Sequence, residues 1–258
     1  MRRWAKASTV RSKKLVQVLQ ARMEWLILGW LGLFCAAAGW RIASAPVAID
    51  DPLAFAQVFV PYALAALAPV AGYRLAMAAF VPGRLPARTS FRLLPLGRWR
   101  SLDALRARAH PAYGPFGFMA SLMVGMLLNI PVRSFEFVLL LPALNGHAPA
   151  WGVTLFRALA FDIIAMNFLY AVCFVMALRA APLFPRMLLF AWSIDLLMQL
   201  SIARRMAAHA DLPPQIAAPL EDLLMGNVTK VLVSAGIWIP YLLLSQRVNV
   251  TYRGRIAP

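Results

Sequence analysis

The sequence predicts an all-α protein, a polytopic transmembrane helical bundle with six spans, and three observations lead to this prediction. Hydrophobic residues make up 62% of the 258-residue chain and charged residues only 14%, whereas soluble domains average about 45–50% apolar and about 25% charged residues. Six apolar segments of about 20 residues or more are each long enough to cross a hydrocarbon core of about 30 Å. The longest connection between them leaves no room for a separate soluble domain.

The chain divides into a basic N-terminal segment, a membrane bundle and a basic tail, which we expect at residues 1–24, 25–245 and 246–258. The six spans are expected at about 25–44, 53–81, 116–144, 153–178, 187–203 and 223–245, with a basic loop at 82–114. In the N-terminal segment, Leu15, Leu19 and Met23 recur every four residues. This spacing predicts a short helix that lies on the membrane surface before the first span.

Prolines and one arginine mark the second and third spans. Pro61 and Pro69 free backbone carbonyls that need partners in lipid, so we expect the second span to be kinked and packed against its neighbours. In the third span, Pro131 is followed by Arg133, which we place near the outer interface. Two interpretations of residues 132–144 are open: the segment continues the third helix, or it lies along the outer face.

The last three spans are joined by one short and one longer connection. We expect residues 179–186 to form a tight inner turn between the fourth and fifth spans. Residues 204–222 contain Pro213 and Pro214 and are expected to form an outer loop before the sixth span.

The chain has a net charge of +16, and the distribution of its Lys and Arg residues predicts the membrane topology. About nineteen of the 26 Lys and Arg residues lie in the N-terminal segment, the basic loop, the short inner turn and the tail, which are alternate connections. Only Arg204 and Arg205 lie in the connections on the other side. Because Lys and Arg concentrate in cytoplasmic loops, we expect both termini in the cytoplasm. No base-stacking module accompanies the charge, so we expect no nucleic-acid partner.

The basic loop also carries a candidate contact with anionic lipid. Aromatic and apolar side chains alternate there with arginines, and the candidate contact residues are Arg92, Arg98, Trp99 and Arg100. In one interpretation the loop lies in the headgroup layer and binds anionic lipid or an acidic partner. In the other, it is a solvated loop whose arginines only orient the protein.

Several short segments in the second half resemble a known family. They are Phe184-Pro185-Arg186, Ile237-Trp238-Ile239-Pro240-Tyr241, Ser245-Gln246-Arg247-Val248 and Thr251-Tyr252. With them the chain resembles the family catalogued as domain of unknown function 2569, uncharacterised bacterial inner-membrane proteins, although Gln246 stands where that family usually has a lysine. The resemblance covers the last four spans and implies a bacterial cytoplasmic membrane. It implies no activity.

A set of polar residues falls at membrane depth and forms the candidate site. From their distance to the ends of the fourth and fifth spans, Asp162 and Asp195 are expected near the midplane of the membrane. Gln199 lies one helical turn after Asp195, so the two can touch. The remaining members of this candidate cluster are Asn167, Lys230, Arg133 and Glu136. Unpaired charges at such depth cost about 3 kcal/mol or more, so we expect these groups to face one another or water.

Two hypotheses describe this cluster. In the first, Asp162 and Asp195 line a polar path that binds a proton, a cation or a polar headgroup, with Lys230 and Arg133 as counter-charges. In the second, the cluster is a static network of ion pairs and hydrogen bonds that fixes which helices lie side by side.

Catalytic, metal and cofactor sites are not predicted. No nucleophile motif is present, the three histidines lie in separate loops, and Cys35 and Cys173 fall inside expected spans. We therefore predict a multi-pass membrane protein that is not an enzyme and acts through lipids or a membrane-protein partner. The alternative is a small proton- or cation-coupled transporter that uses Asp162 and Asp195.

Overall fold

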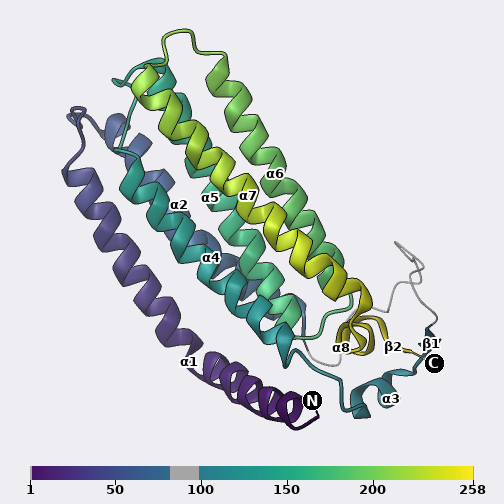
Figure 1. The fold of residues 1–258 in the computed structure, drawn as a ribbon. Coiled ribbons are helices and arrows are strands. Elements are labelled where there is room, and N and C mark those ends of the chain that lie inside the picture. Colours follow the sequence, from purple (N-terminus) through teal and green to yellow (C-terminus); the bar gives the residue numbers. More distant parts are fainter. Residues whose placement is uncertain (1, 82–98, 258) are drawn as a thin grey trace.

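The computed structural model describes residues 2–81 and 99–257, and in this part of the chain six helices are long and apolar enough to cross a membrane. They run roughly side by side in one bundle (Figure 1). They are α1 (Arg2–Ala43), α2 (Pro52–Ala79), α4 (Phe118–Leu140), α5 (Ala150–Leu178), α6 (Phe184–Ala207) and α7 (Pro214–Leu244). The prediction of an all-α, multi-pass membrane bundle is confirmed to this extent.

Helix α5 lies at the centre of the bundle. Helices α2, α4 and α6 all pack on it, whereas α1 packs on α2 and α4, and α7 packs on α6. The contact of α2 with α5 is especially close, because a Cβ atom added at Gly72 would lie 2.6 Å from the carbonyl oxygen of Phe168. Small residues at such contacts let two helices approach closely in lipid. Helix α2 runs through Pro61 and Pro69 without interruption.

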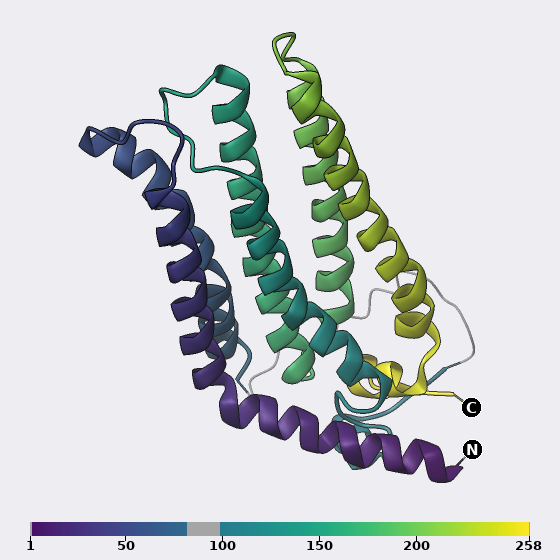
Figure 2. The ribbon, with the colours of Figure 1, turned by 60° about the vertical axis from the view of Figure 1, so that its left-hand side comes forward.

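The basic N-terminal segment and the first expected span form one helix, α1. Figure 2 shows that this helix bends, and that its N-terminal part lies across the end of the bundle that carries both chain termini. We call this the proximal end and the opposite one the distal end. Val16 and Met23 are buried on the bundle, and the hydroxyl of Ser12 accepts a hydrogen bond of 2.7 Å from the backbone N–H of Gly117. The surface helix expected before the first span is therefore continuous with that span.

At the distal end the helices extend further than the sequence suggested. Residues 132–140 continue α4, which settles the open question about this segment. Helix α6 ends at Ala207 and α7 begins at Pro214, so most of the outer loop expected at 204–222 is helical. Arg41 links α1 to the end of α4, because its side chain donates hydrogen bonds to the carbonyls of Leu139 and Leu141.

The expected basic tail is folded onto the proximal end. It comprises α8 (Gln246–Val248), the π-helix η1 (Asn249–Arg253) and β2 (Arg255–Ile256), which pairs antiparallel with β1 (Arg100–Ser101) near the short helix α3 (Ala104–Ala109). The Tyr252 hydroxyl donates to the carbonyl of Ala177 at 2.9 Å, and Thr251 accepts from the N–H of Gly114 at 3.0 Å. Burial, with the nearby charges of Arg255 and Arg186, lowers the pKa of Arg253 to about 10. We call residues 246–257 with 99–117 the proximal cap.

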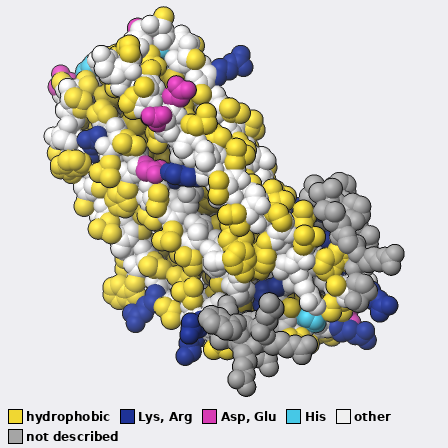
Figure 3. Space-filling model, viewed as in Figure 1, with side chains coloured by type: hydrophobic (Ala, Val, Ile, Leu, Met, Phe, Trp, Pro, Cys, Tyr) yellow, Lys and Arg dark blue, Asp and Glu magenta, His cyan; other side chains and the backbone are white. Residues whose placement is uncertain are grey.

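Charge is unevenly distributed between the two ends. In the view of Figure 3, Lys and Arg gather mainly toward the proximal end and Asp and Glu toward the distal end, with hydrophobic side chains between them. An apolar belt between a basic end and a more acidic end is the pattern expected of a membrane protein with its basic end in the cytoplasm.

Candidate functional site

The centre of the candidate site is an arginine held between two aspartates. Arg133 of α4 donates through one terminal nitrogen to Asp195 of α6 and through the other to Asp162 of α5, each at 2.6 Å. The three side chains are 6%, 1% and 2% exposed, respectively. The two bonds therefore join three helices through fully buried charges. Such a pairing lets charged groups lie at membrane depth, where each alone would be costly.

Hydrogen bonds extend this cluster to α7. The hydroxyl of Tyr170 donates to Oδ2 of Asp195 at 2.9 Å. The amide of Gln199 donates to both carboxylate oxygens of Asp162 at 3.3 Å, so its partner lies on another helix and not one turn away at Asp195. Asn227 of α7 in turn donates to the carbonyl oxygen of Gln199 at 3.3 Å. Four helices are thus connected through one network.

The cluster carries one unbalanced negative charge when its charged groups are ionised. Arg133 contributes one positive charge, and Asp162 and Asp195 contribute two negative charges. The second oxygen of Asp195, Oδ1, is buried and has no hydrogen-bond partner among the described residues. Both oxygens of Asp162, in contrast, accept hydrogen bonds. Of the two carboxylates, only that of Asp195 therefore has an oxygen without a partner among the described residues.

Lys230 pairs with Glu136 and not with either aspartate. Its ammonium lies 2.7 Å from Glu136 of α4 and 3.5 Å from the side-chain oxygen of Asn227. Of the two counter-charges that we expected for the aspartates, only Arg133 contacts them. The Lys230–Glu136 pair instead bridges α4 and α7 beside the cluster.

Asn167 takes part in a separate contact between α4 and α5. Its amide donates to the hydroxyl of Ser134 at 2.7 Å, and Ser134 donates to the carbonyl of Ile130. All the expected cluster members are thus in or beside one polar region, but Asn167 is bonded away from the two aspartates.

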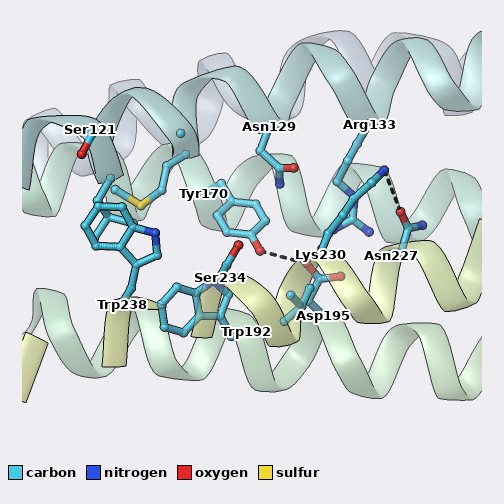
Figure 4. Close-up of a pocket in the computed structure, with 14 residues that line it drawn as sticks. Ser121, Asn129, Arg133, Tyr170, Trp192, Asp195, Asn227, Lys230, Ser234 and Trp238 are labelled. Carbon is cyan, nitrogen blue, oxygen red and sulfur yellow. Dashed lines mark hydrogen bonds and ion pairs between the residues drawn. The ribbon is translucent and has the colours of Figure 1, made fainter. Parts of the chain in front are cut away.

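A cavity of about 180 Å³ lies next to the cluster. It lies between α4 and α7, and residues of α5 and α6 also line it. In Figure 4, polar side chains of α4 point across it toward those of α7. The cavity, which we call the α4–α7 pocket, is lined by Ser121, Leu122, Gly125, Met126, Asn129, Arg133, Tyr170, Trp192, Asp195, Asn227, Lys230, Val231, Ser234 and Trp238. Ser121, Gly125 and Lys230 are exposed on the side of the bundle, so the pocket reaches its lateral surface.

Side chains close the pocket at both ends. Toward the proximal end, the ring of Phe118 of α4 stacks on Trp238 of α7 at 4.6 Å between centroids. On the other side of the pocket, the Lys230–Glu136 pair joins the same two helices. The backbones of α4 and α7 make no close packing contact comparable with that of α4 on α5 or α7 on α6. The space between them is therefore bounded mainly by side chains.

The polar lining runs from near the proximal ends of α4 and α7 toward the middle of these helices. Ser121 lies three residues after the start of α4, or about 5 Å along the helix axis, and Arg133 lies fifteen residues after it, or about 22 Å. Asp195 lies eleven residues after the start of α6, or about 16 Å. Asp195, the residue with the unpaired carboxylate oxygen, thus lines the deep part of the pocket.

Several lining residues were not expected from the sequence. Helical spacing could have found them, because residues three or four apart share a face of a helix. Asn129 lies four residues before Arg133, Trp192 three before Asp195, and Ser234 four after Lys230. Tyr170 carries no such signal near a charged residue of its own helix, because it reaches Asp195 across the α5–α6 contact.

The candidate lipid-contact residues of the basic loop are described only in part. Arg92 and Arg98 lie outside the described residues. Arg100 lies in β1, and the Trp99 ring is covered by the guanidinium of Arg255, with 5.1 Å from its carbon Cζ to the ring centroid. Trp99 and Arg100 therefore belong to the proximal cap, where the tail holds them.

Among the described residues, one group of side chains lies close enough to share a metal ion. Ligand atoms of Asp50, Asp51 and His147 lie within 4.8 Å of one another at the distal end, and all three residues are exposed. Asp51 already caps α2 by accepting from the N–H of Ala54. His147 therefore has acidic neighbours that its position in the sequence did not suggest. An exposed acidic group of this kind does not by itself form a metal site.

Comparisons with protein-family models, with curated proteins and with solved structures find no match to this chain.

Proposed function

We propose that this chain is a bacterial inner-membrane protein with both termini in the cytoplasm, and that it acts without catalysis by binding lipid in the α4–α7 pocket. The concentration of Lys and Arg at the proximal end supports the orientation. The resemblance of the tail segments to domain of unknown function 2569 supports the bacterial inner membrane.

The observation that carries this proposal is a polar pocket that opens on the side of the bundle. Its exposed lining residues, Ser121, Gly125 and Lys230, lie on membrane-spanning helices, where the surrounding medium is lipid. The polar lining begins near the proximal interface, which is the level of the lipid headgroups, and continues inward. A lipid headgroup of the adjacent leaflet can therefore enter the pocket. There it replaces its hydrogen bonds to water by hydrogen bonds to polar side chains. Few other polar molecules reach a site at this depth from the side.

The geometry favours lipid binding over the coupled transporter. A carrier needs carboxylates that gain and lose a proton or cation while helices move. Here Arg133 engages both Asp162 and Asp195, and the same contacts hold α4, α5 and α6 together. The transporter is the second candidate, because one oxygen of Asp195 is still free to bind a cation.

Photo-crosslinking in nanodiscs tests the proposal. The probes are phospholipids with ethanolamine or glycerol headgroups, mixed equally, each carrying a diazirine on an acyl carbon near the headgroup. We expect crosslinks on the α4 and α7 segments that line the pocket, at a depth that an ordinary interfacial lipid does not reach. The crosslinked peptides are mapped by mass spectrometry.

Two glycine variants serve as the test and its matched control. Gly125 lines the pocket, and a Cβ atom there meets nothing within 4 Å, so Gly125→Trp fills the pocket without a backbone clash. Gly236 of α7 is equally unobstructed but is not among the lining residues. We expect Gly125→Trp to remove the deep crosslinks and Gly236→Trp to keep them. Deep crosslinks that survive in Gly125→Trp would show that lipid does not occupy the pocket.

A further inference from the structure

We propose that the headgroup bound in the α4–α7 pocket carries an ammonium group, which donates to Oδ1 of Asp195. This inference rests on the proposed function and names the ligand class of the same site. It follows from the charges around the pocket, from the free acceptor of Asp195 and from the aromatic side chains beside it.

The charges of the site select a cation over an anion. Arg133 is occupied by two carboxylates, and Lys230 is paired with Glu136. Each of the two cations that line the pocket is thus already paired with a carboxylate. The buried triad of Arg133, Asp162 and Asp195 keeps one negative charge in excess. A positive group placed in the pocket neutralises this charge, whereas a negative group adds to it.

The free acceptor belongs to a residue that lines the pocket. Asp195 lines the pocket, and its Oδ2 already accepts from Arg133 and from the hydroxyl of Tyr170. Its Oδ1 is buried without a partner. A buried carboxylate oxygen is stabilised by a donor, and an ammonium has three N–H donors. Ser234 and Asn129 also line the pocket and supply further hydroxyl and amide oxygens as acceptors.

Tryptophan rings complete a site for a cation. Trp192 lies three residues before Asp195 on α6, and Trp238 lies on α7 on the proximal side of the pocket (Figure 4). The face of an indole ring attracts ammonium groups, and more strongly where water is excluded. A phosphate or a neutral hydroxyl group gains nothing comparable from these rings.

This chemistry has two sources in a bacterial membrane, an ethanolamine phospholipid and a free amphiphilic amine. The crosslinking experiment separates them when the diazirine phospholipids are offered singly, with an ethanolamine or a glycerol headgroup. Dodecylammonium, tested as a competitor, represents the free amine, and dodecyl sulfate at equal concentration is the control of opposite charge.

The variants Asp195→Asn and Asp162→Asn separate the free oxygen from the overall charge. Both remove one negative charge from the same cluster, but only Asp195 lines the pocket and has the free oxygen. Asparagine at 195 keeps a carbonyl oxygen for Arg133 and Tyr170 and puts an N–H₂ group in place of Oδ1. We expect Asp195→Asn to weaken binding of the ammonium probe about tenfold or more, the loss typical of a hydrogen bond to a charged group. Asp162→Asn is expected to weaken it much less.

The wild type alone decides part of the question, so the test does not depend on the folding of a variant. Preferential deep labelling by the ethanolamine lipid, or displacement of the label by dodecylammonium and not by dodecyl sulfate, supports the inference and identifies the source. Equal labelling by both phospholipids without displacement by the amine overturns it. If Gly125→Trp still removes that labelling, lipid binding stands and only the ammonium assignment falls.

A thermal unfolding measurement in detergent accompanies the two asparagine variants. Each variant weakens one of the two ion pairs of Arg133, so a similar drop of the midpoint is expected in both. Ammonium binding by the two variants is therefore compared at a temperature at which both are folded. Equal losses of ammonium binding in both asparagine variants overturn the inference.

Discussion

The contact of α2 with α5 and the space between α4 and α7 show two different ways to place helices side by side in a membrane. At the first, small residues bring the backbones together, and the Cβ position of Gly72 is 2.6 Å from a carbonyl oxygen of α5. At the second, large aromatic and charged side chains join the helices, and a pocket of about 180 Å³ lies between them.

The difference teaches where a bundle of this kind is free to bind a ligand. Lipid gives no hydrophobic driving force for helix association, so close packing depends on van der Waals contact between small residues. Where large side chains hold the helices apart, the polar groups between them must pair with one another or with a ligand. The α2–α5 contact therefore serves structure alone, whereas the α4–α7 space combines structure with an unpaired carboxylate oxygen.

The largest effect is expected from Arg133→Met, which removes the charge that joins α4 to α5 and α6. Two buried aspartates then face each other without a counter-charge, and breaking a buried pair in this way costs about 3–5 kcal/mol. Thermal unfolding in detergent measures the loss. Arg157→Met is the control, because Arg157 lies exposed on α5. Similar midpoints for the two variants would show that the triad does not hold the helices.

A smaller loss is expected from Gly72→Leu at the close contact. The atom that the new Cβ meets first is a backbone oxygen, so α2 must move away from α5. Overpacking of this kind costs about 1–3 kcal/mol. Gly236→Leu adds the same side chain where nothing lies within 4 Å and should leave the unfolding midpoint nearly unchanged. Equal midpoints would indicate that the two helices are not closely packed in the protein.

The smallest effect is expected from Lys230→Met at the side of the pocket. The side chains of Lys230 and Glu136 are 53% and 31% exposed, so they are less enclosed than those of the buried triad, and we expect a loss below that of either other variant. A double-mutant cycle with Glu136→Gln isolates the contribution of their pairing from other effects of either substitution. A coupling free energy as large as that of the buried triad would contradict this prediction. The Lys230–Glu136 pair would then hold the helices together as strongly as the triad does.

The bundle itself could be predicted from the sequence because lipid imposes a simple rule. Every span must be long, apolar and helical, so composition and segment length were sufficient. The approximate depth of Asp162 and Asp195 followed from their distance to the ends of their spans. The expectation that these acids would face a counter-charge has the same physical origin, the cost of an isolated charge in hydrocarbon.

The pairing of individual residues could not be predicted, because it depends on how the helices are rotated. Lys230 and Arg133 looked equivalent in the sequence, yet only Arg133 reaches the aspartates. Gln199 was expected to contact Asp195 one turn away, and it crosses to Asp162 instead. The pocket lay beyond prediction for the same reason, since it is formed by the faces that four helices turn toward one another.

The proximal cap has a consequence for how the protein is made. Tyr252 donates a hydrogen bond to the carbonyl of Ala177, and Thr251 accepts one from the N–H of Gly114, so residues that follow α7 anchor connections that are translated much earlier. The contacts of Thr251 and Tyr252 therefore cannot form before α7 has been translated. The proximal cap is therefore completed after the helices, and a chain truncated before Thr251 is expected to keep the six long helices but to lose the contacts that close the proximal end.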